Sequence, residues 1–485
     1  MHAFEEDIMT DQIAETAVGD IATRSAGAMS LDGRQFQFSG ALASGFSPGS
    51  FVTVLDESGR RQIGQVEDIR VDGDSLLGSG RILGVLTPDG RLNGRETFAF
   101  VAAAMEDADA RTVEALYSTA GQTLPIGSFL SETDVAARLL PHRFNRHTFW
   151  VGQSGSGKTY ALGVLVEQLL LHTSLPMVIF DPNADFVRLR EPIDSAADGG
   201  AAADGRTLGE RDIRVLRPAS AEPDALRVRF VDLSMHAKAA VLRLDPLDDR
   251  AEYNELVHLE ETVGTLGAEQ VLPKLLERNT DSARALAARV ENLRVIDWSV
   301  WALGHQAVTD VIETRPDATV LDLGGFSYPD ESLVVAMAVL DDLWAKREQR
   351  RPVLLVIDEA HNLCSPDNDS PLDRAVRERI IQIAAEGRKF GLWLLLSTQR
   401  PSRIHPSIIS QCDNLALMKM SSPLDLDELA TIFGFVPSTM LARSPRFRQG
   451  EALFAGGFVP APSLVKMGTR LTREGGADVS VPIRP

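Results

Sequence analysis

Eight consecutive residues, 152–159, have the types and spacing of a phosphate-binding loop, because they match the pattern G-x-x-x-x-G-K-[ST] at every fixed position. Glycine tolerates the positive φ angles that turn backbone N–H groups inward around a phosphate. In such a loop Lys158 reaches the β- and γ-phosphates, and the Thr159 hydroxyl binds Mg²⁺. The match predicts a site for ATP and Mg²⁺. The predicted nucleotide-binding residues are Gly152, Gln153, Ser154, Gly155, Ser156, Gly157, Lys158, Thr159 and Tyr160.

The sequence around this loop separates a phosphate site from a chance match. Residues 148–151 are predicted to form a short buried strand, and residues 160–171 a helix whose N-terminus faces the phosphates. The alternative is a Gly/Ser-rich linker that contains Lys-Thr. Strand and helix on the two sides favour the nucleotide-binding loop.

A second motif supplies carboxylates. Residues 353–357 form an apolar strand that ends in Asp358 and Glu359, as a Walker B element does. Asp358 is expected to hold Mg²⁺, and Glu359 to polarise the attacking water. The alternative is a buried strand that meets solvent at an acidic end. The intact loop upstream favours the catalytic interpretation. His361 is expected to be a hydrogen-bonding neighbour and not a metal ligand.

A third motif begins at another apolar stretch, residues 390–399. Its last residue, Gln399, is placed to sense the γ-phosphate, although it alternatively caps a turn before Pro401. Just upstream, Arg388 and Lys389 end a helix. Each of the two cations is either a partner of the helix dipole or a finger residue that enters a neighbouring subunit's site.

Composition limits the class of protein. The chain has 485 residues, 44% of them hydrophobic and 24% charged, which is typical of a soluble globular protein with two or three domains. Its two cysteines, Cys364 and Cys412, exclude a disulfide framework. No membrane partner or secretion signal is expected, so a cytoplasmic location is predicted. The net charge of −19 argues against a surface that binds nucleic acid all over, but not against a basic pore.

The fold class predicted from these patterns is α/β, with a parallel-sheet P-loop ATPase core, a small N-terminal β-barrel and a helical insertion. Residues 51–54 and 62–66 are expected to form a hairpin of the barrel, whereas residues 35–38 are either part of a flexible arm or a first strand. Further core strands are predicted at 177–181, 227–233 and 319–323. A surface loop is predicted at 195–205. The predicted divisions are an arm (1–40), a barrel (41–135), a first core part (136–234), a helical subdomain (235–303), a second core part (304–460) and a C-terminal brace or tail (461–485).

Taken together, the motifs resemble the HerA/FtsK superfamily of motor ATPases, and HerA in particular. The resemblance rests on 151–159, 357–362, 386–391 and 397–402, and it extends to 410–412 and 473–479. It implies that the core is RecA-like and that the barrel is the HAS barrel of that family. The stretch Asp181-Pro182-Asn183-Ala184-Asp185 departs from the His-Gly-Glu type ending of many relatives.

The resemblance implies a homo-hexameric ring with ATP between subunits and duplex DNA in the pore. Lys158 and Thr159 then bind phosphate and Mg²⁺, Asp358 supports the metal and Glu359 is the catalytic base. Gln399 is the sensor, and Arg388 is the finger, with Lys389 as its competitor. A NurA-like nuclease or a phage-defence effector is the implied partner. The cations expected to face DNA are Arg400, Arg403 and Lys419.

Two functions of different class remain open at this point. One is an ATP-driven DNA translocase or helicase. The other is an assembly scaffold that recruits and activates an effector under the control of ATP, which the acidic charge favours. A conjugation or chromosome-segregation pump is a weaker third alternative. Stimulation of ATP hydrolysis by DNA distinguishes the first two.

Overall fold

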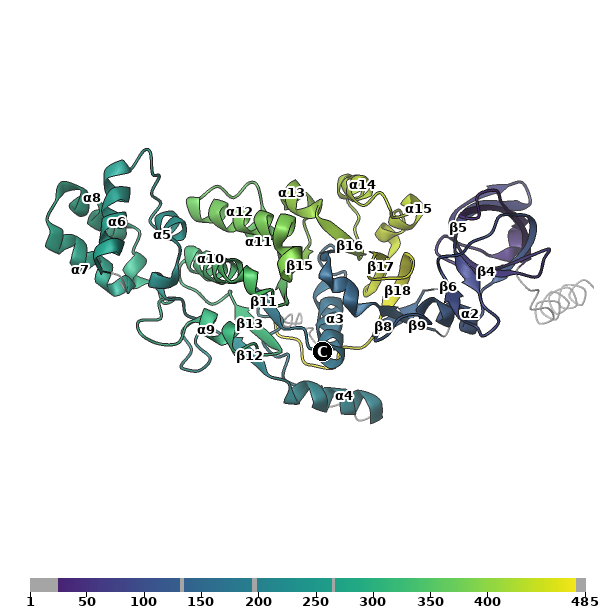
Figure 1. Cartoon of the computed structure of the whole chain (residues 1–485), viewed down its shortest axis with the longest axis horizontal. Coiled ribbons are helices and arrows are strands. Elements are labelled where there is room, and N and C mark those ends of the chain that lie inside the picture. The colour runs from purple at the N-terminus through teal and green to yellow at the C-terminus, as the bar shows by residue number, and fades with distance from the viewer. Residues whose placement is uncertain (1–24, 131–134, 194–198, 264–266, 477–485) are drawn as a thin grey trace, which may run out of the picture. The chain divides into compact units, whose positions relative to one another are not determined.

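The computed structural model describes residues 25–130, 135–193, 199–263 and 267–476, and the chain divides into two units after Thr119 (Figure 1). Each unit is built around one β-sheet. Within the described residues, no helix has both the length and the apolar character needed to cross a membrane.

The first unit is a closed antiparallel barrel. Its strands pair in the cyclic order β1–β2–β5–β4–β3–β7, and the short strand β6 pairs with the C-terminal end of β5. In β2, Phe36 and Phe38 are buried while their neighbours are exposed, so the alternating side chains point into the barrel. The predicted barrel and its hairpin of β3 and β4 are confirmed. The strands are β1 (Ser25–Ser30), β2 (Gln35–Ala41), β3 (Phe51–Asp56), β4 (Arg61–Asp72), β5 (Ser75–Leu86), β6 (Leu92–Asn93) and β7 (Phe100–Asp107).

The barrel differs from the predicted range of 41–135 at both ends. Both β1 and β2 precede residue 41, so residues 35–38 form a strand, while residues 1–24 of the predicted arm lie outside the described residues. At the other end, β8 (Leu124–Phe129) pairs with a strand of the second unit.

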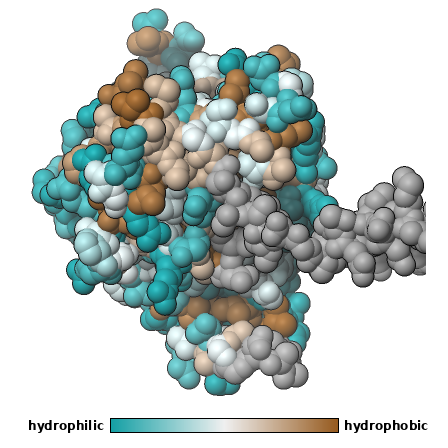
Figure 2. Space-filling view, turned by 90° about the vertical axis from the view of Figure 1, so that its right-hand side faces the viewer, coloured by the Kyte–Doolittle hydropathy of each residue, from teal (hydrophilic) through white to brown (hydrophobic). Residues whose placement is uncertain are grey.

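The surface of the barrel shows apolar side chains among hydrophilic ones (Figure 2).

The second unit contains an eleven-stranded sheet in the order β12-β13-β11-β14-β15-β10-β16-β17-β18-β8-β9. The first seven strands are parallel and the remaining pairs are antiparallel. The bounds are β9 (Ala136–Leu139), β10 (His147–Val151), β11 (Met177–Asp181), β12 (Ile213–Leu216), β13 (Ala318–Asp322), β14 (Val353–Ile357), β15 (Leu392–Thr398), β16 (Cys412–Leu417), β17 (Glu451–Gly456) and β18 (Ser463–Met467).

Strand order places the motifs together. Strand β15 lies between β10, which leads into the phosphate-binding loop, and β14, which leads into the two carboxylates. Successive residues of these strands are buried on both faces, for example Trp150 and Val151 of β10, as expected for a covered parallel sheet. Because the strands are parallel, their C-terminal ends meet at one edge, where ligands bind in such sheets.

Helices of this unit begin or end at the residues that the local chemistry favours. Helix α12, for example, begins after Ser370, whose side chain caps the N–H of Asp373. The longer helices are α3 (Lys158–His172), α4 (Gly199–Glu210), α10 (Pro329–Ala345), α12 (Pro371–Glu386) and α14 (Pro423–Ile432), and the shorter ones are α9 (Val308–Glu313), α11 (His361–Cys364), α13 (Pro406–Ile409) and α15 (Ser438–Leu441), with α2 (Ala110–Glu114) in the first unit.

Two predictions for this unit were wrong, whereas the strands predicted at 177–181 and 319–323 are present as β11 and β13. The predicted strand at 227–233 makes only an isolated bridge from Val228 to Trp301, because its apolar side chains pack against the insertion, and β12 takes the place in the sheet. The predicted loop at 195–205 is helical from Gly199, where alanine favours a helix, and residues 194–198 lie outside the described residues. The helical insertion is confirmed by α5 (Met235–Val241), α6 (Arg250–Val263), α7 (Ala268–Arg278) and α8 (Asp281–Asn292).

Candidate nucleotide-binding site

The phosphate-binding loop connects β10 to α3 in the predicted way. Gly155 and Gly157 have φ angles of 76° and 86°, which only glycine adopts without strain. Two backbone hydrogen bonds hold the start of the loop, from Gly152 N to Thr398 O (3.3 Å) and from Gln153 N to Lys419 O (2.9 Å). The loop is therefore attached to the ends of the strands on both sides of β10, and its N–H groups precede the N-terminus of α3.

Lys158 joins the loop to the second motif. Its Nζ lies 2.8 Å from Asp358 Oδ1 and 3.1 Å from Glu359 Oε1. It also donates to Ser397 Oγ (2.9 Å), which in turn donates to Asp358 Oδ1 (2.7 Å). Burial alone would lower the pKa of Lys158, but the charges of Asp358 and Glu359 outweigh burial and raise it. The ammonium group is therefore held in its charged form where a phosphate would bind.

The two carboxylates are arranged for different tasks. Asp358 is 2% exposed, and its Oδ2 has no hydrogen-bond partner within the described residues, which suits an oxygen that takes a Mg²⁺ ion or its water. Glu359 has a φ of 44°, a strained value for a non-glycine residue that turns the side chain toward the loop. His361 Nδ1 lies 3.2 Å from Glu359 Oε2, and its hydrogen bond is to Thr398 Oγ1 (3.2 Å), so this histidine is a hydrogen-bonding neighbour of the site.

The protonation state of Glu359 follows from these neighbours. Burial tends to raise its pKa, but the close contact with His361 and the charge of Lys158 together lower it. Glu359 is therefore ionised at neutral pH and able to accept a proton from water. No group of three or more metal-ligating side chains is found among the described residues. Mg²⁺ that binds with a nucleotide ordinarily has one or two carboxylate ligands, with phosphate and water as the others.

A pocket of about 680 Å³ opens over the loop, which is large enough for a nucleotide. It contains Lys158, Thr159, Glu359 and Gln399 together, so four predicted residues from three separate places in the sequence meet in one cavity. The remaining residues that line the pocket are Gln153, Ser154, Gly155, Gly157, Tyr160, Asn183, Asp185, Gln449, Gly450, Lys466, Met467, Glu474 and Gly476.

One wall of the pocket is acidic. Asp181, at the end of β11, is fully buried and accepts hydrogen bonds from the N–H groups of Asp185 (2.9 Å) and Phe186 (2.8 Å). Burial, followed by the charge of Asp181, raises the pKa of Asp185 to about 7. Burial likewise raises the pKa of Asp181 to about 6. The segment that departs from the usual family ending thus faces the nucleotide pocket.

Arg388 is not in this pocket. It lies before β15 while Gln399 follows β15, so the seven-residue strand separates them by about 20 Å. Arg388 Nη1 instead lies 3.2 Å from Asp413 Oδ2. Lys389 occupies the same turn. Arg400 and Arg403 lie just beyond the end of β15, and the backbone of Lys419 holds the phosphate-binding loop.

Several residues of the site were not predicted. Ser397 lies inside a motif of the family resemblance, but a serine within an apolar strand gives no signal of a contact with Lys158. Asp185 lies in the stretch that departs from the family pattern and Glu474 in one that resembles it, but neither sequence pattern indicates a role for the side chain. Gln449, in the turn before β17, and Met467, at the end of β18, reach the pocket from segments that are distant in sequence, so only the fold reveals them.

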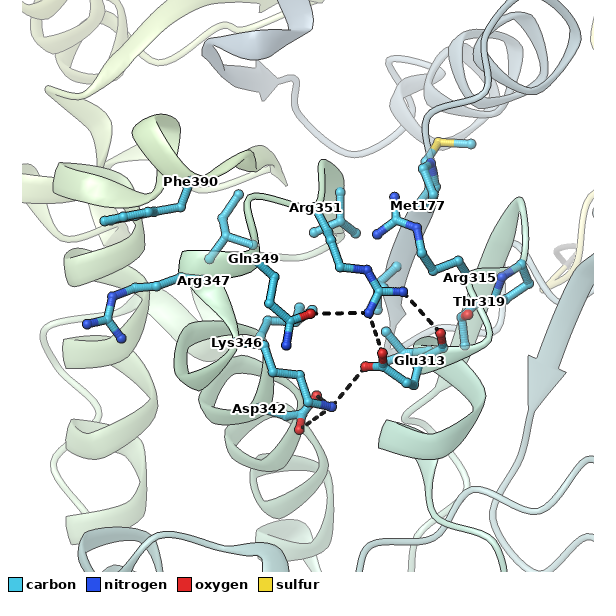
Figure 3. A pocket seen from close by; sticks show the side chains of 17 residues that line it. Met177, Glu313, Arg315, Thr319, Asp342, Lys346, Arg347, Gln349, Arg351 and Phe390 are labelled. Atoms are coloured by element: carbon cyan, nitrogen blue, oxygen red, sulfur yellow. Dashed lines mark hydrogen bonds and ion pairs between the residues drawn. The ribbon is translucent and has the colours of Figure 1, made fainter.

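A second, smaller cavity of about 40 Å³ lies at the opposite edge of the sheet (Figure 3). Three of its cations are Arg315, Lys346 and Arg351. Glu313 bonds to Arg351 and to Lys346, and Lys346 also pairs with Asp342 at 2.9 Å. Because Lys346 and Arg351 are already paired with carboxylates and the space is close to that of a water molecule, this cavity is a poor candidate for a nucleotide.

Comparison with known proteins agrees with the geometry. Residues 124–341 match the family model described as the central domain of helicase HerA. The probable DNA double-strand break repair helicase HerA of Methanocaldococcus jannaschii is 20% identical over an alignment of 496 positions that covers 89% of this chain and 93% of that protein. The DNA double-strand break repair helicase HerA of Sulfurisphaera tokodaii is 24% identical over 369 residues, which cover 71% of this chain and 69% of that protein.

Among solved structures, the plasmid coupling protein TrwB in complex with a non-hydrolysable ATP analogue has a similar fold. Its TM-score is 0.50 at 14% sequence identity, and the match covers 75% of this chain and 94% of that chain. This likeness supports the P-loop ATPase fold of the second unit.

Proposed function

Because this chain is a HerA-like ATPase of the HerA/FtsK superfamily, and so an ATP-hydrolysing enzyme, we propose that it is a DNA translocase that works as a ring of six copies. The proposal has three parts, which are hydrolysis at the described pocket, completion of that pocket by a neighbouring copy, and movement of duplex DNA through the pore.

The chemistry follows from the groups that surround the pocket. Glu359 accepts a proton from the attacking water, and Lys158 neutralises charge that develops on the γ-phosphate. Mg²⁺, held by Asp358 and Thr159, would supply charge neutralisation at the β- and γ-phosphates. Gln399, at the end of the strand between β10 and β14, reports the presence of the γ-phosphate to the segment that follows it.

The observation that carries the ring is the position of Arg388. A seven-residue strand separates it from the pocket of its own chain, so it reaches a nucleotide only in another copy. Its present partner, Asp413, is an exposed carboxylate whose ion pair contributes little free energy, so Arg388 exchanges it readily for a phosphate. A head-to-tail contact of this kind generates a closed ring when its rotation closes.

DNA contacts are proposed for Arg400, Arg403 and Lys419. The first two follow Gln399 directly, and the third is joined through its carbonyl to the phosphate-binding loop. Loss of the γ-phosphate therefore shifts segments that carry cations, which is the coupling a translocase needs. These cations contact phosphates and not bases, so binding is expected to weaken steeply with salt.

We propose a partner nuclease or defence effector, because no nuclease motif is recognised in the sequence and any cleavage of DNA would then be done by a partner. An assembly scaffold is the second candidate function. An apolar groove of about 710 Å³ on the barrel, bordered by the exposed side chains of Val101 and Leu55, favours it. In that case ATP controls assembly, and the effector, not DNA, stimulates hydrolysis.

Displacement of the third strand from a DNA triplex tests translocation directly, because a protein that moves along the duplex removes the strand bound to it. The wild type with ATP and Mg²⁺ is expected to displace the strand, whereas the variant Glu359→Gln is expected to bind ATP without displacement. Displacement that is equal in the two proteins, or absent from an actively hydrolysing wild type, would contradict the translocase.

A further inference from the structure

The last described segment of the chain, residues 470–476, runs along the helix that follows the phosphate-binding loop and is here named the strap. Its anchor is Glu167 of α3, which is fully buried. Glu167 accepts hydrogen bonds from Leu471 N (2.8 Å), from Thr472 N (2.9 Å) and from the Thr472 hydroxyl. The strap also forms an isolated bridge between Thr472 and Pro192.

A second buried charge fixes the same contact. Arg470 is 1% exposed, and its Nε lies 3.5 Å from Glu167 Oε1. The helix accommodates this guanidinium at Gly163, where a Cβ atom would lie 2.7 Å from it. Burial raises the pKa of Glu167, against the effect of its hydrogen bonds. If the strap undocks, Glu167 loses its hydrogen-bond and ion-pair partners, and a buried carboxylate without partners costs free energy. The docked position of the strap is therefore strongly favoured.

The strap contacts the nucleotide pocket at two places. At its start, Arg470 N donates to the hydroxyl of Tyr160 (2.8 Å), and Tyr160 follows Thr159 and lines the pocket. Near its end, Gly475 N donates to Asp185 O (3.1 Å). The strap therefore extends along the pocket from the first turn of α3 to the loop after β11.

The far contact is tightly packed. A Cβ atom at Gly475 would lie 1.8 Å from Ala184 O, and one at Gly476 would lie 2.7 Å from Asp185 Oδ1. Ala184 itself has a φ of 59°, which is unfavourable for alanine. The strap and this strained loop are therefore packed tightly against each other. Glu474 and Gly476 of the strap line the pocket beside Asp185.

We propose that the strap is a positioning element of the nucleotide site, and that its docking and the binding of ATP are thermodynamically linked. The docked strap fixes Tyr160 at one end of the pocket and the Asp185 loop at the other. By linkage, a nucleotide that binds better when the strap is docked also strengthens the docking. The inference rests on ATP binding but does not require DNA movement or a ring.

The first experiment measures the Kd of a fluorescent, non-hydrolysable ATP analogue with Mg²⁺. Gly475→Ala displaces the far end of the strap, and Thr472→Val removes one hydrogen bond at the anchor. Each is expected to weaken binding about tenfold, Gly475→Ala because its Cβ would clash with Ala184 O and Thr472→Val because it loses one well-placed polar contact. The matched controls are Gly457→Ala, where a Cβ meets nothing closer than 3.7 Å, and Thr431→Val, which also loses a side-chain hydrogen bond; both are expected to stay within about twofold.

The second experiment measures cleavage by trypsin after Arg473, an exposed residue of the strap, by mass spectrometry. Saturating analogue is expected to slow this cleavage about tenfold in the wild type, because cleavage requires the strap to open. A strap that only stabilises the fold would lower the melting temperature of Thr472→Val and Gly475→Ala yet leave both Kd values unchanged.

Unchanged Kd values, or cleavage at Arg473 that does not respond to the analogue, would overturn the proposal. Absence of analogue binding in the wild type would overturn the ATP site together with it. Hydrolysis that DNA fails to stimulate contradicts only the translocase and leaves a positive result for the strap in place.

Discussion

Lys158 Nζ donates a hydrogen bond of 2.8 Å to Asp358 Oδ1, across 200 residues of sequence. This bond joins the phosphate-binding loop to the end of β14. The same ammonium group contacts Glu359, so one cation holds both carboxylates of the site. A γ-phosphate and Mg²⁺ bound in this pocket would lie next to the same ammonium group and the same two carboxylates.

Replacement of Ser397 tests this arrangement. The Ser397 hydroxyl bridges Lys158 and Asp358, so Ser397→Ala removes hydrogen bonds to two charged groups. We expect kcat to fall about 10- to 100-fold, with a smaller change in KM. Steady-state ATPase assays measure both. Ser407→Ala, at an exposed position, is the control, and equal kinetics in the two variants would show that the bridge is dispensable.

Separate replacements of Arg388 and Lys389 show which of the two residues is the finger. Arg388→Ala is expected to lower kcat about 10³-fold, as loss of an arginine finger does, whereas Lys389→Ala is expected to have little effect. The opposite ranking would assign the role to Lys389.

A mixture of two inactive variants tests whether Arg388 acts on a neighbouring copy. Glu359→Gln retains Arg388, and Arg388→Ala retains Glu359. In mixed rings, the first variant supplies its arginine to the intact pocket of the second, so hydrolysis is expected to recover part of the wild-type rate. Rates equal to the sum of the separate variants would contradict action between subunits.

The lowered pKa of His147 predicts that the stability of the protein depends on pH. This residue begins β10, is 1% exposed and accepts a hydrogen bond from Leu394 N (3.0 Å), and burial lowers its pKa to about 4. The unfolded chain takes up the proton near pH 6.5, but the folded chain does so only near pH 4. Stability is therefore lost as pH falls through this window, by about 2 kcal/mol between pH 7 and pH 5.

The variant His147→Asn checks that assignment, because asparagine can accept the same hydrogen bond but does not titrate. Urea denaturation at pH 7 and pH 5 is expected to show a smaller loss of stability in the variant than in the wild type. An equal loss in both would show that other groups cause the acid sensitivity.

Sequence patterns were sufficient for the residues whose chemistry requires a fixed local spacing. The glycines of the loop, Lys158, and the pair Asp358 and Glu359 belong to such motifs, and the pocket contains Lys158, Glu359 and Gln399 together. The strand expected at 227–233 failed because an apolar run fits a helical interface as well as a sheet. The strap could not be predicted, because its anchor joins Glu167 to Thr472 across the whole core.

The most direct test of the central claim is ATP hydrolysis by the purified protein with and without linear duplex DNA. A translocase predicts hydrolysis that DNA stimulates several-fold, that salt weakens, and that Glu359→Gln abolishes. Hydrolysis at the same rate with and without DNA, again abolished by Glu359→Gln, would contradict the translocase and favour a scaffold that responds to its effector.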